Sequence, residues 1–241
     1  MPKKAVSLLS GGMDSTVLAY MLKADGHDVH LLSFDYGQRH VKELAAAAMI
    51  AEQLNVRHDV VALLVGGYPE GGLSPLATVI GTSSLTNSAI EVPDGHYAEE
   101  TMRITVVPNR NAIMLSIAYG VAVADKADLV AFAAHAGDHA IYPDCRPEFV
   151  TSLNAALQIG NTGFVNPLPQ VKGPFLTTDK AGIVTIGTGL GVPFELTWSC
   201  YKGEKIHCGR CGTCVERKEA FQLAKIDDPT AYKDYAYMGE A

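Results

Sequence analysis

The chain has 241 residues, of which 48% are hydrophobic and 19% are charged, and its formal net charge is -7. This composition is typical of a globular protein with a large core and excludes a disordered chain. The excess of acidic residues argues against tight, sequence-independent binding to nucleic acid, which needs a basic surface. We therefore expect one large domain, with or without a small appendage.

The apolar segments predict no membrane span. The apolar run after Lys4 is too short for a signal peptide. The longest apolar stretch, residues 112–124, ends at Asp125 and is too short to cross a bilayer, so we expect a buried core helix there. These features favour a soluble, cytoplasmic protein.

Apolar runs alternate with amphipathic runs, which is typical of a parallel sheet with helices on both faces. We expect strands at residues 5–9, 29–34, 58–62 and 129–133, and helices at 13–23, 41–55, 110–124, 149–157 and 178–187. The predicted fold class is α/β, with a doubly wound parallel sheet. Ligands of such sheets lie at the carboxyl ends of strands, so the loops at 10–15, at 35–40 and after Ala134 are the informative ones.

The first functional motif, Ser10-Gly11-Gly12-Met13-Asp14-Ser15, stands between the first expected strand and the first expected helix. A Gly-Gly turn there leaves backbone N–H groups unpaired, and the helix dipole favours an anion at the same place. Ser10 and Ser15 add hydroxyl donors, whereas the Asp14 carboxylate needs a divalent cation beside phosphates. Neither of the commoner phosphate-loop patterns fits. We interpret the loop as an ATP–Mg site; the alternative is an ordinary strand-to-helix turn.

This motif resembles the pyrophosphate-binding loop of the ATP pyrophosphatase superfamily, which is written SGGxDS. The resemblance implies that the protein adenylates a substrate oxygen and holds the departing pyrophosphate in this loop. The residues expected to bind nucleotide are Ser10, Gly11, Gly12, Met13, Asp14, Ser15 and Thr16. Asp14 is expected to support the metal directly or through water.

Residues 66–107 show little periodicity and are rich in Gly, Pro, Ser and Thr. A loop of this length is functional or disordered in most compact domains. Because it interrupts a nucleotide-binding sheet, we predict an insertion that closes over the site as a lid; a surface loop is the alternative. The predicted domains are 1–195, which binds nucleotide and includes the insertion, and 196–241, a tail packed on it.

Four of the five cysteines form the pattern Cys200-x7-Cys208-x2-Cys211-x2-Cys214. Thiolates at two-residue spacing bind a single metal ion, and four thiolates suit tetrahedral zinc. Four thiolates leave no open position for water, so we expect one structural zinc per chain. An iron–sulfur cluster and disulfides are the alternatives. The tail is therefore predicted to be a small C-terminal zinc-binding appendage.

A polar loop follows the fourth expected strand, where a ligand-contacting segment is expected. Asp144 offers two acceptors for a guanine-like edge, and Arg146 offers a planar guanidinium that suits a carboxylate. The alternative is a proline-bounded turn with a local Asp–Arg pair. We interpret Cys145 as a buried thiol in preference to a nucleophile. His135 and His139 have the spacing of helical metal ligands, but a Gly between them and the lack of a third ligand argue against a metal site.

Five segments together resemble the family of 7-cyano-7-deazaguanine synthases. They are SGGMDS at 10–15, FDYGQRH at 34–40, VPNRN at 107–111, YPDCRPEF at 142–149, and WSCY with CGRCGTC within 198–214. The first motif is shared by a superfamily, whereas YPDCRPEF and the cysteine tail are more specific. The chain departs from the family at Asn109, where many members have glycine.

The resemblance implies a PP-loop fold and a zinc-dependent ligase of queuosine biosynthesis. Such an enzyme converts 7-carboxy-7-deazaguanine and ammonia to the 7-nitrile by adenylating the carboxylate and then the amide, with ATP and Mg as co-substrate and with release of AMP and pyrophosphate. The implied catalytic residues are Asp14, Arg110 and Arg146, and the implied substrate-binding residues are Gln38, Arg39, Tyr142, Asp144 and Arg146. No nucleic acid or membrane partner is expected, and the apolar surplus permits a homodimer.

Two other functions stay open. Another adenylating enzyme of the superfamily that acts on tRNA would carry a basic face or an RNA-binding domain, and neither is visible in the sequence. A free thiol of low pKa would favour tRNA thiolation, and Cys145 is the one cysteine outside the cluster. A zinc-stabilised nucleotide-binding protein without catalysis would bind ATP but release no AMP.

Overall fold

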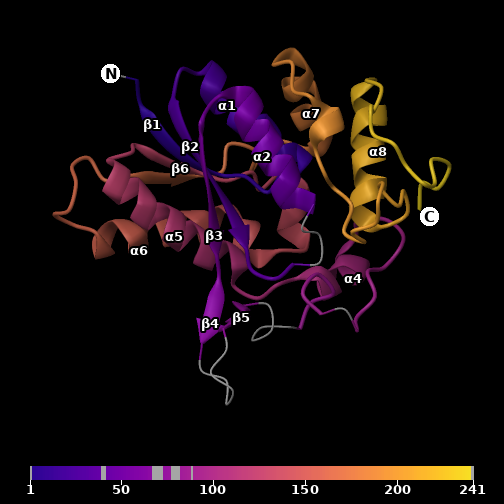
Figure 1. Cartoon of the computed structure of the whole chain (residues 1–241), viewed down its shortest axis with the longest axis horizontal. Helices are drawn as coiled ribbons and strands as arrows, with labels where there is room; N and C mark the ends of the chain where they lie inside the picture. Colours follow the sequence, from indigo (N-terminus) through magenta and orange to yellow (C-terminus); the bar gives the residue numbers. More distant parts are fainter. Residues whose placement is uncertain (1, 39–41, 67–72, 77–81, 88, 240–241) are drawn as a thin grey trace.

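The computed structural model describes residues 2–38, 42–66, 73–76, 82–87 and 89–239. Its centre is a five-stranded parallel sheet with the order β3-β2-β1-β6-β7 (Figure 1). The strands are β1 (Lys4–Leu8), β2 (Asp28–Asp35), β3 (Arg57–Ala62), β6 (Leu129–Ala131) and β7 (Gln170–Lys172). A separate antiparallel pair, β4 (Leu64–Gly66) and β5 (Leu73–Pro75), projects from the body of the molecule.

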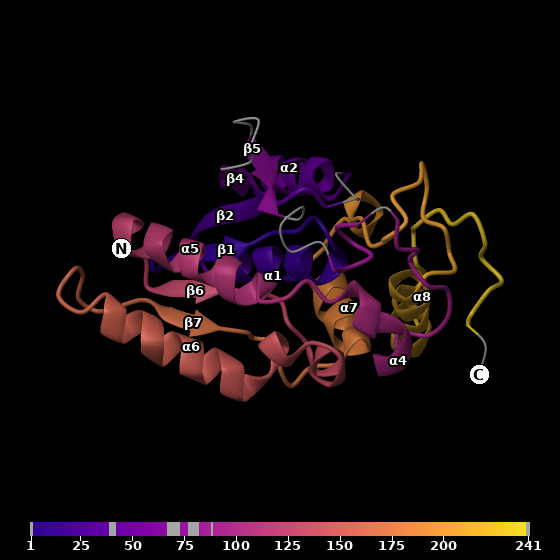
Figure 2. The ribbon, with the colours of Figure 1, turned by 90° about the horizontal axis from the view of Figure 1, so that it is seen from below.

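Helices cover both faces of the sheet (Figure 2). They are α1 (Met13–Ala24), α2 (Lys42–Leu54), α4 (Glu99–Met102), α5 (Arg110–Asp125), α6 (Pro147–Gly160), α7 (Lys180–Gly189) and α8 (Gly212–Ala224). Short 3₁₀ helices lie at Arg103–Thr105, Ala136–Ala140, Pro143–Cys145 and Phe194–Leu196. Helices α5 and α6 pack against Val6 and Val130 on one face, and α1, α2 and α7 pack against Ala5 and Leu31 on the other. The expected doubly wound parallel α/β fold is confirmed.

Side-chain alternation explains how the central strands build two core layers. Successive residues of a strand point to opposite faces, so Ala5 and Val6 of β1 enter different apolar clusters. In β2 every residue from 29 to 34 is buried. A strand covered by helices on both faces reads as a nearly continuous apolar run, and this is the pattern that identifies β1 and β2 in the sequence.

All the strands and helices expected from the sequence are present, with ends that differ by a few residues. Strand β7 is missed because it has three residues and only Val171 is buried. Helix α8 is missed because its buried face includes Arg217 and Lys218, which interrupt the apolar periodicity that identifies an amphipathic helix.

The segment expected to form an insertion is described at 73–76, 82–87 and from 89 onward, and these parts contribute to the core. Leu85, Met102 and Val107 are buried in the same apolar cluster as α5. Asp94 forms an isolated antiparallel bridge with Cys211. Closure of this segment over a ligand stays a prediction, and so does the division of the chain after residue 195.

Helix α8 is held to the rest of the molecule by a buried arginine. The Arg217 side chain is fully buried, and its guanidinium pairs with Asp228 at 3.2 Å. It also donates to the Thr197 hydroxyl at 2.6 Å and to the Phe194 carbonyl at 3.0 Å. Phe221 of α8 packs edge-on against Phe194, with ring centroids 5.0 Å apart. Charge and apolar contact therefore both attach α8 to residues 194–197.

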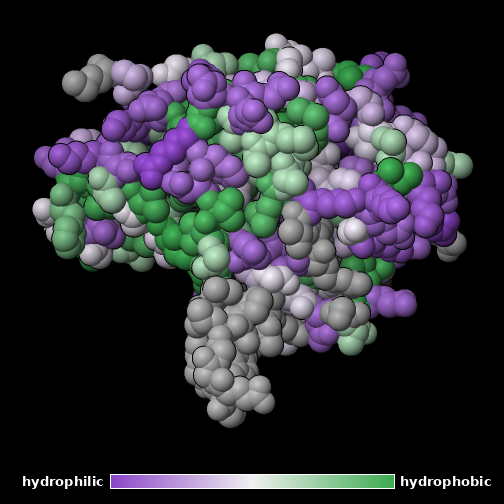
Figure 3. Space-filling model, in the orientation of Figure 1, coloured by the Kyte–Doolittle hydropathy of each residue, from purple (hydrophilic) through white to green (hydrophobic). Residues whose placement is uncertain are grey.

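The surface differs in polarity between its two ends (Figure 3). Hydrophobic side chains gather over α5 and α6, whereas polar side chains dominate around α8. Ile159 and Phe164, at and just beyond the end of α6, are 76% and 77% exposed. Within the described ranges, every helix is too short or too polar to cross a bilayer.

The Arg217→Met variant tests the buried arginine. Methionine keeps much of the side-chain volume but removes the cationic partner of the half-buried Asp228 carboxylate and the donor to Thr197 and Phe194, so we expect the free energy of unfolding to fall by about 3–5 kcal/mol. The matched control is Arg210→Met, because Arg210 is 44% exposed and pairs with Asp94 and Asp234 at the surface. Its loss is expected to be below about 1 kcal/mol. Equal losses in urea denaturation would contradict the assignment.

Candidate functional site

A cavity of about 230 Å³ opens at the carboxyl ends of β1, β2 and β6. The strand order reverses direction between β1 and β6, and at such a point the loops that follow the strands diverge and leave room for a ligand. The polar and aromatic lining includes Ser10, Asp14, Ser15, Tyr36, Gln38, Glu43, Arg110, Asn111, Asp138 and Tyr201. The cavity therefore lies where the fold predicts a nucleotide site.

The Gly-Gly turn after β1 is tightly packed by its neighbours. Gly11 has φ +83°, a conformation that side chains other than glycine rarely adopt. A Cβ atom there would lie 2.2 Å from the carbonyl oxygen of Glu43 and 2.8 Å from the amide nitrogen of Ala47. The Gly11 carbonyl also accepts a hydrogen bond from the Trp198 amide at 2.8 Å. Glycine at position 11 thus lets α2 and the segment around Trp198 both approach the loop.

The hydroxyls of the loop form a small network. The Ser10 and Ser15 Oγ atoms are 3.0 Å apart, and Ser10 Oγ accepts from the Gly12 amide at 3.2 Å. Thr16 donates both its amide and its hydroxyl to the Gly12 carbonyl, at 3.1 and 2.8 Å. The Met13 side chain is buried in the core. Ser10, Gly12, Asp14 and Ser15 line the cavity, whereas the structure does not bring the side chains of Met13 and Thr16 to it.

Asp14 belongs to a buried ionic cluster. Its Oδ2 atom lies 3.3 Å from Lys180 Nζ, which lies 2.5 Å from Glu216 Oε2. Burial alone would lower the pKa of Lys180, but the carboxylates of Asp14 and Glu216 outweigh this effect and raise it. Among the described residues, no hydrogen-bond partner reaches the buried Oδ1 atom of Asp14. An oxygen ligand of this kind fits a divalent cation.

The cluster continues through the loop after β6. Asp138 accepts hydrogen bonds from the Tyr97 hydroxyl at 3.0 Å and from the His135 amide at 3.1 Å. His135 Nε2 lies 3.5 Å from Asp138 Oδ1 and 3.7 Å from Glu216 Oε1, while its Nδ1 accepts from the Gly137 amide. His135 therefore takes part in a carboxylate network that adjoins the cavity.

A second charged group lies on the other side of the cavity. Arg110, the first residue of α5, hydrogen-bonds to the Tyr36 hydroxyl. Burial disfavours its charge, yet the surrounding tyrosines, Tyr36 first among them, raise the pKa of Arg110. Burial raises the pKa of Glu43 to about 8, and the positive charge of Arg110 opposes this shift. The cavity thus holds a fixed cation and a carboxyl group that titrates near neutral pH.

Two of the residues expected to bind substrate follow β2. Gln38 lines the cavity, but its side chain braces the turn: Oε1 accepts from the Tyr36 amide at 3.0 Å, and Nε2 donates to the Phe34 carbonyl at 2.9 Å. Arg39 lies outside the described residues. Whether either side chain contacts a substrate stays a prediction.

Tyr142, Asp144 and Arg146 lie together behind the cavity lining. The Tyr142 hydroxyl is buried and lies 2.8 Å from the Thr105 hydroxyl. Asp144 accepts from the Asn111 amide at 3.1 Å, in the first turn of α5. Arg146 donates to the His139 carbonyl at 2.8 Å. In this structure the three side chains brace the turn, and their expected contacts with substrate stay predictions.

Cys145 lines the cavity from the same turn. Its thiol is buried, as expected, and accepts a hydrogen bond from the Asn111 side chain at 3.2 Å. Burial raises the pKa of Cys145, and the nearby carboxylates of Asp138 and Asp144 raise it further. A thiol with a raised pKa is a poor nucleophile at neutral pH.

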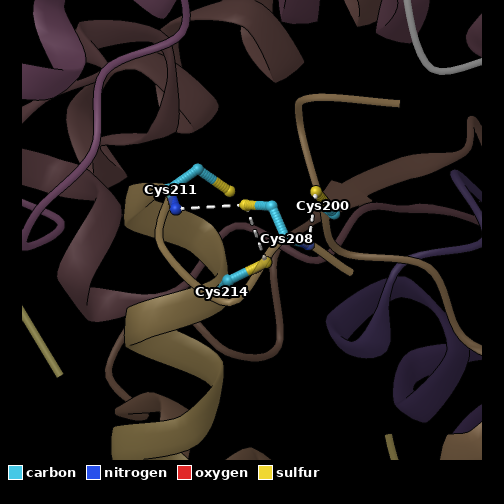
Figure 4. A group of neighbouring side chains, drawn as sticks. All are labelled: Cys200, Cys208, Cys211 and Cys214. Atoms are coloured by element: carbon cyan, nitrogen blue, oxygen red, sulfur yellow. Dashed lines mark hydrogen bonds between the residues drawn. The ribbon is translucent and has the colours of Figure 1, made fainter. Parts of the chain in front are cut away.

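The four clustered cysteines converge on one buried space (Figure 4). Their sulfur atoms all lie within 4.8 Å of one another, and Cys208 Sγ is 3.9 Å from Cys214 Sγ. Four sulfurs bound tetrahedrally at a Zn–S distance of about 2.3 Å would be about 3.8 Å apart. All five cysteines are free, so the disulfide alternative does not fit. This spacing leaves room for one ion rather than for several irons with bridging sulfides.

Backbone amides complete the cysteine site. The amides of Arg210 and Cys211 donate to Cys208 Sγ at 3.4 and 3.3 Å, and the amide of Cys208 donates to Cys200 Sγ at 3.4 Å. Gly209 has φ +78°, and a Cβ there would lie 2.0 Å from the carbonyl oxygen of Asp234. In the part of the chain that the structure describes, these cysteines are the one group of three or more His, Cys, Asp or Glu side chains whose ligand atoms lie close enough together to hold one metal ion.

Comparison with known proteins identifies the family. A family model described as "Queuosine biosynthesis protein QueC" matches residues 4–225. The chain belongs to the QueC family. Three curated relatives, each named 7-cyano-7-deazaguanine synthase, are similar to nearly the whole chain. The relative from Allorhizobium ampelinum is 54% identical over 96% of this chain and 93% of its own, that from Rhizobium johnstonii 51% over 99% and 95%, and that from Brucella ovis 52% over 96% and 94%.

Among solved structures, NMN synthetase from Francisella tularensis is similar to 94% of this chain and 79% of its own, with 17% identity and a TM-score of 0.48.

The QueC family match runs from the first residue of β1 to just beyond α8. The sheet, the cavity and the cysteine site therefore all lie within the matched region.

The one departure from the expected family pattern has a backbone explanation. Asn109 precedes α5 with φ +59°, in the left-handed region that favours glycine. Asparagine is among the residues that tolerate this region best after glycine. Asn109 thus supports the left-handed conformation before Arg110 that a glycine would also support.

Three charged residues of the site that lie on α-helices were not expected from the sequence: Glu43, Lys180 and Glu216. A charged residue in the first turns of a helix normally reads as solvent-exposed. For two of these residues, the position in the sequence relative to a recognised motif could have indicated a role in the site. Glu43 opens the helix that follows the 35–40 loop, and Glu216 stands two residues after Cys214. Lys180 carries no local signal, because its role depends on the packing of α7 beside the nucleotide loop.

The Cys211→Ser variant tests the metal site. Serine cannot replace a thiolate ligand, so we expect loss of the bound metal in elemental analysis. Each kcal/mol lost lowers the Tm of a chain this size by roughly 2–4 °C, and we expect a fall on the order of 10 °C. Cys145→Ser is the control, because it removes the one thiol outside the cluster and should keep the metal. Equal metal content in the two variants would contradict the assignment.

Proposed function

We propose that the chain is an ATP-dependent ligase that converts 7-carboxy-7-deazaguanine and ammonia to 7-cyano-7-deazaguanine, with release of AMP and pyrophosphate. The observation that carries the proposal is the meeting of the 10–15 loop, Arg110 and Glu43 in one cavity at the strand ends. The name 7-cyano-7-deazaguanine synthase, borne by relatives that are 51–54% identical over nearly the whole chain, supports this substrate.

The first chemical demand is activation of a carboxylate, which is a poor electrophile. Its oxygen attacks the α-phosphate of ATP, and pyrophosphate leaves as an acyl adenylate forms. We propose that amides and hydroxyls of the 10–15 loop hold the pyrophosphate, since Ser10, Gly12 and Ser15 line the cavity at the N-terminus of α1. Asp14 would hold Mg²⁺ through its free Oδ1 atom, and Mg²⁺ would neutralise charge that develops on the leaving group.

The second demand is the placement of the carboxylate itself. Arg110 is a half-buried cation that lines the same cavity as the nucleotide loop, and it hydrogen-bonds to the Tyr36 hydroxyl. A guanidinium matches both a carboxylate and a phosphate oxygen. We propose that Arg110 binds the reacting carboxylate and stabilises the charge that builds up in each adenylation. The Nε atom of Arg146 donates to the His139 carbonyl, and a contact of this guanidinium with the substrate stays a prediction.

The third demand is removal of protons from nitrogen. Ammonia displaces AMP to give the amide, and its nitrogen loses one proton. A second ATP then adenylates the amide oxygen with release of pyrophosphate, and the adenylated amide loses AMP to give the nitrile. The nitrogen loses its two remaining protons between amide and nitrile. Glu43 lines the same cavity and titrates near the pH at which a general base works best. We propose Glu43 as that base.

Zinc is our proposal for the ion of the cysteine site. Four thiolates around one ion are the ligand set of structural zinc sites, and they leave no position for a substrate. A homodimer and a cytoplasmic location are proposed from the sequence alone. Sedimentation of the purified protein would test the dimer.

The Asp14→Asn variant tests the nucleotide site. The amide keeps the shape of the side chain but removes the charge that a divalent cation needs, so we expect AMP formation to fall by at least about 100-fold. Mass spectrometry of AMP and nitrile, with ATP, Mg²⁺, ammonium and 7-carboxy-7-deazaguanine, measures both products. The control is Asp25→Asn, an exposed residue at the other end of α1, and it should keep wild-type turnover. Wild-type AMP release from Asp14→Asn would sink the assignment.

The pH profile tests Glu43. A general base acts when deprotonated, so the rate should rise with pH and level off above about 8, the pKa of Glu43. Glu43→Gln should lose this rise and fall in rate by about 10²–10⁴-fold. Rates are compared at equal free ammonia, because ammonium deprotonates as the pH rises. Glu52→Gln, at an exposed position of the same helix, is the control. The same rise in Glu43→Gln would exclude the role.

A further inference from the structure

The cysteine site is connected to the nucleotide loop from both of its ends. Trp198 stands two residues before Cys200, and its amide donates to the Gly11 carbonyl at 2.8 Å. Glu216 stands two residues after Cys214 and lies 2.5 Å from Lys180, which in turn contacts Asp14. One metal ion bound by Cys200 and Cys214 would therefore fix the positions of Trp198 and Glu216 relative to each other.

Lys180 is shared unequally between its two carboxylates. Its Nζ atom is 2.5 Å from Glu216 Oε2 and 3.3 Å from Asp14 Oδ2, and the side chain is 15% exposed. A buried ammonium keeps a carboxylate beside it, because an unpaired buried charge is strongly unfavourable. With Glu216 in place, Asp14 is a weak partner of Lys180, and its Oδ1 atom stays free. Without Glu216, Asp14 would become the closest carboxylate to Lys180.

From this geometry we propose that Glu216 is a positioning residue, which draws Lys180 away from Asp14 so that Asp14 can bind a divalent cation with ATP. We further infer that the metal in the cysteine site keeps Glu216 in place. Helix α8 begins at Gly212 with Cys211 as its N-cap, so Cys214 lies in its first turn and Glu216 follows two residues later. A metal bound to these cysteines sets the start and the rotation of α8, and with them the direction of the Glu216 side chain.

The inference rests on the proposed ATP chemistry and adds a role for the structural metal in it. The metal does not touch the substrate; it acts on the nucleotide site through Glu216 and Lys180. Trp198 gives a second link of the same kind, because its ring N–H donates to the Cys200 carbonyl at 2.9 Å while its amide holds Gly11.

The test compares Glu216→Gln with wild-type holoprotein. Calorimetry measures the affinity for α,β-methylene-ATP, which cannot release pyrophosphate, at increasing Mg²⁺ concentrations. We expect Glu216→Gln to need about ten-fold more Mg²⁺ for half-maximal binding, as when an outer-shell partner of a metal ligand is lost. Elemental analysis should match wild type. The control is Glu219→Gln, one turn along α8, where the carboxylate pairs with His96 at 3.0 Å; its Mg²⁺ requirement should not change.

A second variant shows whether Glu216 acts through Lys180. In a Lys180→Met background the ammonium is gone, so adding Glu216→Gln should change the Mg²⁺ requirement no further. Additive effects would overturn the proposal, and so would a wild-type Mg²⁺ requirement in Glu216→Gln or a loss of cysteine-bound metal from that variant. Failure of wild-type holoprotein to bind the analogue with Mg²⁺ would overturn the ATP proposal itself, and with it the role of Glu216.

Discussion

The buried ammonium of Lys180 is the interaction on which the functional site depends. It joins three segments that are far apart in the sequence: the loop after β1, the start of α7 and the first turns of α8. Charges in a protein interior are tolerated only in neutralising sets, so each member constrains where the others lie. Lys180 lies 3.3 Å from the half-buried Asp14 carboxylate at the nucleotide loop and pairs with it as well as with Glu216. The charge that surrounds Asp14 in the loop therefore depends on the position of α8, which carries Glu216.

The sheet and the nucleotide loop could be predicted from the sequence because their signals are local. Continuous apolar runs identify strands that are buried on both faces, and the glycines of the loop follow from backbone geometry at Gly11. The four-cysteine site is also a spacing signal, since two of its intervals are two residues long. Strand β7 could not be predicted, because it has three residues and is paired only by its parallel neighbour β6.

The ionisable residues of the site could not be predicted for a different reason. Glu43, Lys180 and Glu216 lie on three helices, and charged residues on helices are usually solvated. Only the tertiary packing brings them beside the loop. For the expected substrate residues, the motif could be recognised but the contacts could not be predicted. Asp144 and Arg146 belong to a recognisable motif, yet in this structure their side chains hydrogen-bond to the backbone of Asn111 and His139. A motif identifies which residues matter more readily than it identifies what each one contacts.

Helix α8 connects the cysteine site to the loop after β1. Its buried face includes Arg217 and Lys218 as well as Val215 and Phe221, so apolar burial alone provides less of its attachment than in an ordinary amphipathic helix. The ion pair of Arg217 with Asp228 and the cysteine site supply the rest. Polar contacts of this kind depend on the direction of the donor and acceptor groups, and tetrahedral coordination of one ion would restrict the directions of four cysteine side chains at once. A helix attached in this way holds Glu216 at a fixed position. An interface made of apolar contacts alone would let the helix rotate slightly about its axis, and Glu216 would move with it.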